Sequence, residues 1–138
     1  QGLDARLVTE DIAQLLARIR WTGSIRFGCD NAAQIPYIEQ AYRLLKKYGY
    51  NRRIFGYCLI KDPEESIARV LYMRRYDWFD PFCRPYRDWS NPNQIIPQWQ
   101  KDFARWVDMK AIYKSVELKD YQPRKGFYFR DYGFNIQG

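Results

Sequence analysis

Three short apolar stretches that end in polar residues alternate along this chain with segments of helical periodicity. The apolar stretches are residues 24–30, 53–61 and 80–88, and they recur about every 25 to 30 residues. The segments between them carry apolar residues three and four positions apart, which is the spacing of one helix face. Strands that alternate with helices at this interval are typical of βα units, so the pattern predicts an α/β fold with about three parallel strands.

Capping residues mark the ends of the predicted helices. The first helix is expected from Glu10 to about Arg20, after Thr9 as N-cap. The second is expected over about residues 36–48 and the third over residues 63–75, each with a proline in its first turn. The first helix has a narrow apolar stripe, which predicts packing against the sheet: Ile12, Leu15, Leu16 and Ile19.

The pattern changes after residue 88. Residues 89–97 are rich in Asn and Pro and predict a loop. An amphipathic helix marked by Trp99, Phe103 and Trp106 is expected next, then a shorter helix over residues 109–115 and an irregular tail. We therefore expect one domain, in which residues 1–90 form the βα part and residues 91–138 form a helical and irregular extension packed on it.

The two faces of each predicted strand differ in character, because side chains alternate along a strand. One face carries Cys29, Cys58 or Cys83 among apolar or small residues, and we expect it to lie under the helices with the cysteines as core residues. The opposite faces are polar and aromatic and are expected to line a shared interior, as in a partial (β/α) barrel: Arg26, Asp30, Tyr57, Lys61, Arg84 and Tyr86.

Ligand sites in parallel α/β sheets lie at the carboxyl ends of the strands, where Asp30, Lys61 and Arg84 are expected. An internal salt bridge between Asp30 and one of these cations is the structural alternative. Two cations beside one carboxylate exceed what pairing requires, which favours a site for an anionic group such as a carboxylate or phosphate.

The composition narrows the possible chemistry. The chain has no histidine, which excludes imidazole acid–base catalysis and histidine-ligated zinc. Its three cysteines lack CxxC spacing, so we expect neither a disulfide scaffold nor a zinc site, and a reducing cytoplasm suits them. No apolar run is long enough to span a bilayer, so no membrane partner is expected. The first residue is Gln, and we interpret the chain as a fragment of a longer protein.

The net charge of +7 leaves a nucleic-acid-binding module as an alternative function. Most basic residues are dispersed among separate elements, several at helix ends, where a cation opposes the helix dipole. Residues 74–79 interleave cations and rings as single-strand binders do, although a helix-to-strand turn is the favoured interpretation. A noncatalytic α/β scaffold is a further alternative.

The order of the motifs resembles the C-terminal half of the barrel of radical SAM enzymes. Residues 1–7 look like the tip of the family's third strand, residues 25–31 like the fourth, residues 53–66 like the fifth with its turn, and residues 80–88 like the sixth. Residues 103–106 and 113–115 resemble the tail of uncharacterised microbial and phage members. The cluster-binding CxxxCxxC motif is absent, and Lys61 stands where many members have a glycine.

This resemblance implies radical chemistry with S-adenosylmethionine and a [4Fe–4S] cluster on a substrate that the sequence does not identify. It implies cofactor contacts from Asp30, Asn31, Tyr57 and Lys61. Substrate contacts are expected from Arg84, Tyr86 and Arg87. No catalytic residue and no metal ligand is assigned, because the cluster ligands are not in this chain. The chain is expected to supply part of the cofactor and substrate walls and to be inactive alone.

Overall fold

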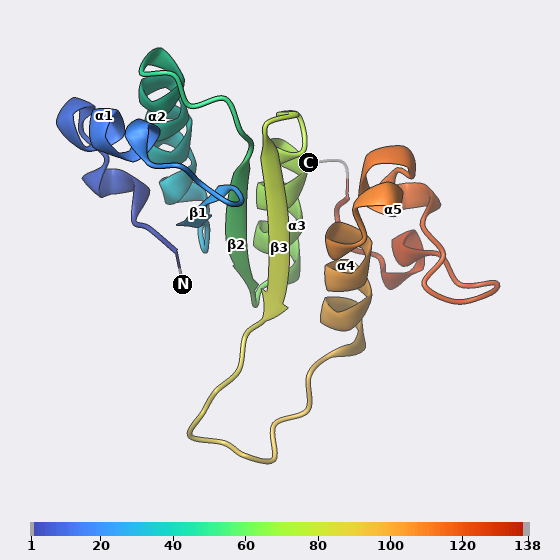
Figure 1. Cartoon of the computed structure of the whole chain (residues 1–138). Helices are drawn as coiled ribbons and strands as arrows, with labels where there is room; N and C mark the ends of the chain where they lie inside the picture. The colour runs from blue at the N-terminus through green and yellow to red at the C-terminus, as the bar shows by residue number, and fades with distance from the viewer. Residues whose placement is uncertain (1, 137–138) are drawn as a thin grey trace.

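Three parallel strands in chain order form the sheet of this protein, whose computed structural model describes residues 2–136 (Figure 1). The strands are β1 (Ile25–Gly28), β2 (Ile54–Ile60) and β3 (Phe79–Pro85). β2 is central and pairs with both neighbours, with Tyr57 opposite Gly28 on one side and opposite Phe82 on the other. The α/β class, the parallel sense and the strand order are confirmed. β1 and β2 end before the predicted tip residues Asp30 and Lys61, whereas Arg84 lies within β3, opposite Leu59.

The helices follow the predicted pattern. They are α1 (Glu10–Arg18), α2 (Ile35–Lys47), α3 (Pro63–Met73), α4 (Gln98–Asp108) and α5 (Lys110–Ser115). The hydroxyl of Thr9 accepts the amide of Ile12 at the start of α1, and the carboxylate of Asp62 accepts the amide of Glu65 at the start of α3. Single 3-10 turns complete the chain: η1 (Ala5–Leu7), η2 (Ala32–Gln34), η3 (Leu118–Asp120) and η4 (Phe129–Tyr132). Within residues 2–136, no helix is both long and apolar enough to cross a bilayer.

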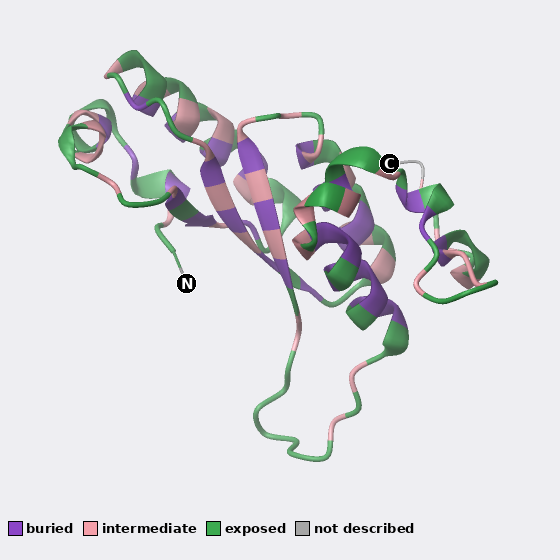
Figure 2. Ribbon diagram, turned by 45° about the vertical axis from the view of Figure 1, so that its right-hand side comes forward, coloured by how far each residue is buried: buried purple, intermediate pink, exposed green. Residues whose placement is uncertain are grey.

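Burial alternates along β2 and β3, as Figure 2 shows. Cys29, Cys58 and Cys83 all lie in the core, which confirms the face assignment. Gly56 shares this face, and a Cβ atom there would lie 2.2 Å from the ring of Phe79. The small residue in β2 therefore leaves the space that the Phe79 ring of β3 fills.

The apolar stripe of α1 does not pack against the sheet, contrary to the prediction. Ile12, Leu15 and Ile19 are 41%, 58% and 50% exposed, and α1 lies beside α2 with Ala13 buried (Figure 1). Before β1, the described chain contributes one bridging residue to the sheet, Leu3.

The backbone of Leu3 covers part of the β1 edge of the sheet. Leu3 forms a parallel bridge with Phe27, in which its amide donates to Arg26 O at 2.7 Å and its carbonyl accepts from Gly28 N at 3.3 Å. Gly2 precedes it with a φ of 103°, and a Cβ there would lie 2.9 Å from Arg26 O, so this approach requires glycine. The edge of the sheet at β1 is thus partly covered by Leu3.

The outer edge of β3 is closed by side chains at the junction of α4 and α5. The amide of Cys83 donates to Asp108 Oδ1 at 2.8 Å, and the ammonium of Lys110 donates to the carbonyl of Pro81. These are the backbone groups that a neighbouring strand would otherwise pair with.

The C-terminal tail covers α4 with aromatic side chains. Phe129 of η4 is completely buried, with its ring centroid 5.9 Å from that of Phe103, and Phe134 contacts Trp99 edge to face at 5.5 Å. Because α4 in turn packs on β3, the tail and the sheet are linked through one layer of helix.

Candidate functional site

Aromatic rings and arginines occupy the sheet face opposite the buried cysteines, which we call the open face (Arg26, Phe55, Tyr57, Leu59, Phe82 and Arg84). The rings of Phe55, Tyr57 and Phe82 contact one another at centroid distances of 5.1 to 6.2 Å. The guanidinium of Arg26 lies 5.3 Å from the Phe55 ring and donates to the Tyr57 hydroxyl at 3.1 Å, while that of Arg84 lies 4.1 Å from the Phe82 ring. A sheet face of this composition is suited to polar or planar ligands rather than to a closed apolar core.

Asp30 lies at the tip of β1 and joins it to β2. Its Oδ1 accepts the amide of Leu59 at 3.0 Å, and its own amide donates to the side chain of Gln34. Among the described residues, Asp30 forms no ion pair with Lys61 or Arg84, so the structural alternative of an internal salt bridge is not what forms here. The exposed carboxylate is held in place by backbone contacts and stays available as an acceptor.

Three of the seven predicted site residues line one hollow of about 630 Å³ on the open face: Asp30, Tyr57 and Arg84. Arg84 also lines a second hollow of about 740 Å³ with Tyr86, Arg87 and Trp89. The structure therefore brings the predicted cofactor and substrate residues to adjoining spaces that meet at Arg84.

The other two predicted residues lie at the margin. The ammonium of Lys61 lies 4.6 Å from the centroid of the Tyr86 ring, at the edge of the second hollow. Asn31 caps η2 in a reciprocal arrangement with Gln34 and lines neither hollow. Asn31 is thus committed to local structure, and Lys61 contributes charge at the rim.

Arg69 was not predicted to take part in the site. It is 3% exposed on α3, and its guanidinium donates to the carbonyls of Cys29 and Leu59, the latter at 2.8 Å, and to Glu65. The Arg69 side chain of α3 thus holds the carboxyl ends of β1 and β2 together. The sequence signal was weak, because Glu65 and Arg69 have the spacing of an ordinary surface ion pair.

The charge balance around the two hollows is positive. Arg26, Arg84, Arg87 and the carboxylate of Asp30 line the two hollows, with Lys61 at the rim; a second carboxylate, Asp88, follows Arg87 in the loop. Hydrogen bonds from Ser90 lower the pKa of Asp88, so this group is ionised at neutral pH. The surplus is suited to an anionic ligand.

A metal cluster does not fit the described residues. Within residues 2–136, no group of three or more His, Cys, Asp or Glu side chains is placed to hold a metal ion. The hydrogen bond with Cys58 and burial raise the pKa of Cys29 well above its ordinary value, so this thiol stays protonated. We derive no chemical step through an iron–sulfur cluster.

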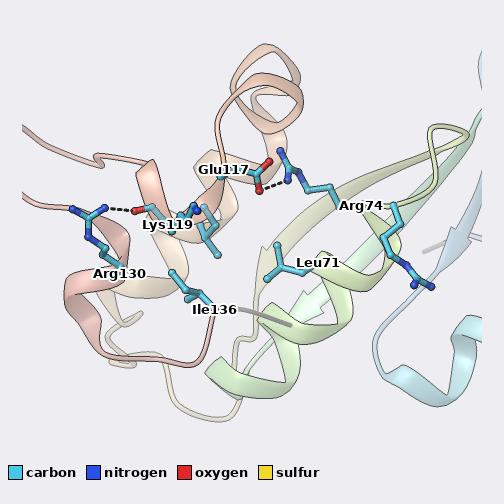
Figure 3. Close-up of a pocket in the computed structure, with 8 residues that line it drawn as sticks. Leu71, Arg74, Glu117, Lys119, Arg130 and Ile136 are labelled. Carbon is cyan, nitrogen blue, oxygen red and sulfur yellow. Dashed lines mark hydrogen bonds and ion pairs between the residues drawn. The ribbon is translucent and has the colours of Figure 1, made fainter.

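The largest hollow, about 870 Å³, lies at the C-terminal end of α3, away from the strand tips (Figure 3). Two of its charged groups are partnered: Arg74 donates to Glu117 at 2.9 Å, and Arg130 donates to the carbonyl of Lys119 at 2.7 Å. The first contact joins the end of α3 to the tail and the second lies within the tail, so we assign this hollow a structural role.

The basic and aromatic segment over residues 74–79 is also used internally. Trp78 stacks on Tyr42 at 4.1 Å, the Tyr76 hydroxyl donates to Glu39, and Phe79 is buried. Residues 74–78 form the turn between α3 and β3, as the favoured interpretation predicted.

Comparison with protein-family models, curated proteins and solved structures gives no match to this chain. The interpretation of the site therefore depends on its own geometry.

Proposed function

We propose that the open face and the strand tips are part of the ligand wall of a partial (β/α) barrel of the radical SAM type, binding S-adenosylmethionine beside an anionic substrate. The observation that carries this proposal is the hollow on the open face where Arg26, Tyr57 and Arg84 lie near Asp30, the residue at the carboxyl end of β1. A purely structural barrel would fill this side with branched apolar residues. The chain's order of strands and helices supports the same proposal.

Each residue has a chemical reason for its role. The carboxylate of Asp30 is an acceptor only, which is suited to ribose hydroxyls or to the amino group of S-adenosylmethionine. Tyr57 offers a ring and a hydroxyl beside that carboxylate. Arg84 can hold a carboxylate or phosphate with two parallel hydrogen bonds, whereas Lys61 at the rim acts as a point charge.

The contribution of this chain is binding and orientation. S-adenosylmethionine supplies a 5′-deoxyadenosyl radical when it is cleaved reductively at a [4Fe–4S] cluster, and the described residues do not provide ligands for that cluster. The unpaired cysteines agree with the proposal that the protein works in a reducing compartment, the cytoplasm.

The proposal is tested by titrating S-adenosylmethionine into ¹⁵N-labelled protein and following backbone amide signals. We expect shifts concentrated at Asp30, Tyr57 and Leu59. Asp30→Ala should weaken binding by about 1.5–3 kcal/mol, or about 10- to 150-fold, because a charge-assisted hydrogen bond is lost.

Asp30→Asn separates the two roles of this residue, since it keeps an acceptor for the Leu59 amide and removes the charge. Asp11→Ala, which removes an acid from the first turn of α1, is the matched control and should bind like the parent. If millimolar S-adenosylmethionine leaves the open-face signals unchanged, or if both Asp30 variants bind like the parent, the proposed function is wrong.

A further inference from the structure

Three neighbouring hollows follow one another from the open face over the strand tips to the loop after β3. The hollow of about 630 Å³ and the hollow of about 740 Å³ share Leu59 and Arg84 in their walls. The latter shares Arg87 and Trp89 with a third hollow of about 290 Å³. We call these three hollows together the tip groove. A groove of this extent is suited to a chain-like ligand more than to a single small molecule.

Cations are spaced along the tip groove. Arg26, Arg84 and Arg87 are all exposed and line it in that order, from the sheet to the loop. Among the described residues, none of these three arginines forms an ion pair. These three guanidinium groups are therefore not held in an ion pair, in contrast to that of Arg74.

Rings alternate with these cations. Phe55, Tyr57 and Phe82 lie half-buried on the open face, and Tyr86 and Trp89 follow toward the loop. Trp89 is 88% exposed, and a large ring in that position contributes little to folding because water surrounds it. The loop that carries it extends away from the sheet and helices (Figure 1). An exposed ring that lines both the second and the third hollow has the chemistry of a contact surface.

We propose that the tip groove binds single-stranded nucleic acid, with phosphates at Arg84 and Arg87 and a base stacked on Trp89. Single-strand binders combine a positive groove that follows the backbone with rings on which successive bases stack. An acidic polypeptide would use the cations and leave the rings without partners. A duplex keeps its bases stacked inside and would not reach the half-buried rings. The inference builds on the proposed function, since it makes the anionic substrate a polynucleotide.

The test is fluorescence anisotropy with labelled single-stranded DNA and RNA of mixed sequence, about 12 nucleotides long. Arg84→Ala combined with Arg87→Ala should weaken binding and reduce the slope of log K against log salt by about 1.4, or about 0.7 for each phosphate contact. Trp89→Ala should weaken binding about 5- to 150-fold, the range for one lost base stack, and leave the salt slope unchanged. Because Trp89 is exposed, this variant should fold like the parent.

The matched control is Arg75→Ala combined with Lys119→Ala, which removes two exposed cations from the wall of the largest hollow. It should keep the affinity and the salt slope of the parent. Unlabelled single strand should displace the probe, whereas the corresponding duplex and poly-glutamate should displace it poorly.

The inference is overturned if the control weakens binding as much as the Arg84 and Arg87 double variant does. It is also overturned if Trp89→Ala binds like the parent, or if duplex or poly-glutamate competes as well as single strand. The S-adenosylmethionine titration is independent of these outcomes: cofactor binding without oligonucleotide binding removes this inference alone, and the reverse result removes the proposed function alone.

Discussion

The carboxylate of Asp108 accepts a hydrogen bond at the closed edge of β3, and its protonation affects the stability of the fold. Burial raises its pKa to about 6, against the hydrogen bond from the Cys83 amide, which lowers it. The folded state therefore binds this proton more tightly than the unfolded chain, whose carboxyl has a pKa of about 3.9. The contribution of Asp108 to the free energy of unfolding is highest below about pH 4 and is lost as the pH rises through about 6.

Asp108→Asn should remove this dependence and keep an acceptor for the Cys83 amide. Relative to the parent, the variant should gain about 1–2 kcal/mol of stability between pH 4 and pH 7, less than a fully buried group would give because solvent screens this site. Urea unfolding at a series of pH values measures the difference. Asp88→Asn is the control: hydrogen bonds from Ser90 lower the pKa of Asp88, so its contribution to stability is lost only as the pH falls below about 4, and no gain is expected between pH 4 and pH 7. Equal stability of the parent and Asp108→Asn proteins at both pH 4 and pH 7 would contradict the prediction.

Single residues of the site could be predicted as far as strand alternation determines them. Tyr57 and Arg84 lie on the open face because their neighbours Cys58 and Cys83 are buried, and that two-residue period is visible in the sequence. Arg69 could not be found in this way, because its burial depends on carbonyls of β1 and β2 that come together only in the folded sheet.

At the scale of elements, α3 is joined to the tips of two strands through Arg69. Arg69→Met should lower the free energy of unfolding by about 2–5 kcal/mol, since it leaves two carbonyls without a donor in a buried site. Arg69→Lys should recover only part of this loss, because an ammonium lacks the planar fork that reaches both carbonyls.

Urea unfolding followed by circular dichroism measures these differences. Arg43→Met on the exposed side of α2 is the matched control and should change stability by less than about 0.5 kcal/mol. An Arg69→Met protein as stable as this control would show that the tips are held by other contacts.

Helices and strands were predicted well where local sequence signals determine them. The surface on which an element packs was predicted poorly, because it depends on elements that are distant in the sequence. The side chains of Thr9 and Asp62 cap α1 and α3 by accepting hydrogen bonds from the backbone amides three residues later. The starts of these helices are therefore determined by the local sequence. The apolar stripe of α1 led us to predict a contact with the sheet, whereas α1 lies beside α2. Periodicity shows that a face is apolar, but it does not show what covers that face.

At the scale of the whole molecule, the C-terminal tail should fold together with the sheet. Phe129→Ala should lower the free energy of unfolding by about 3–5 kcal/mol, because it leaves a cavity against Phe103 in the core beneath η4. The loss should appear in one transition that tryptophan fluorescence and circular dichroism report alike.

Phe127→Ala is the matched control, since this ring is half-buried and should cost less. Two separate transitions in the parent, or a Phe129→Ala protein that changes fluorescence at Trp99 and Trp106 without changing the unfolding of the sheet, would mean that the tail is an independent unit.

The two edges of the sheet differ in how they are closed to a further strand. A foreign strand that approached β3 would find the Cys83 amide and the Pro81 carbonyl engaged by Asp108 and Lys110, so recruitment and amyloid-like stacking are blocked on that flank. On the opposite flank, Leu3 has already started a further parallel row with one residue. The β3 flank is therefore closed to a further strand by two side chains, whereas the β1 flank is closed over the length of one backbone residue.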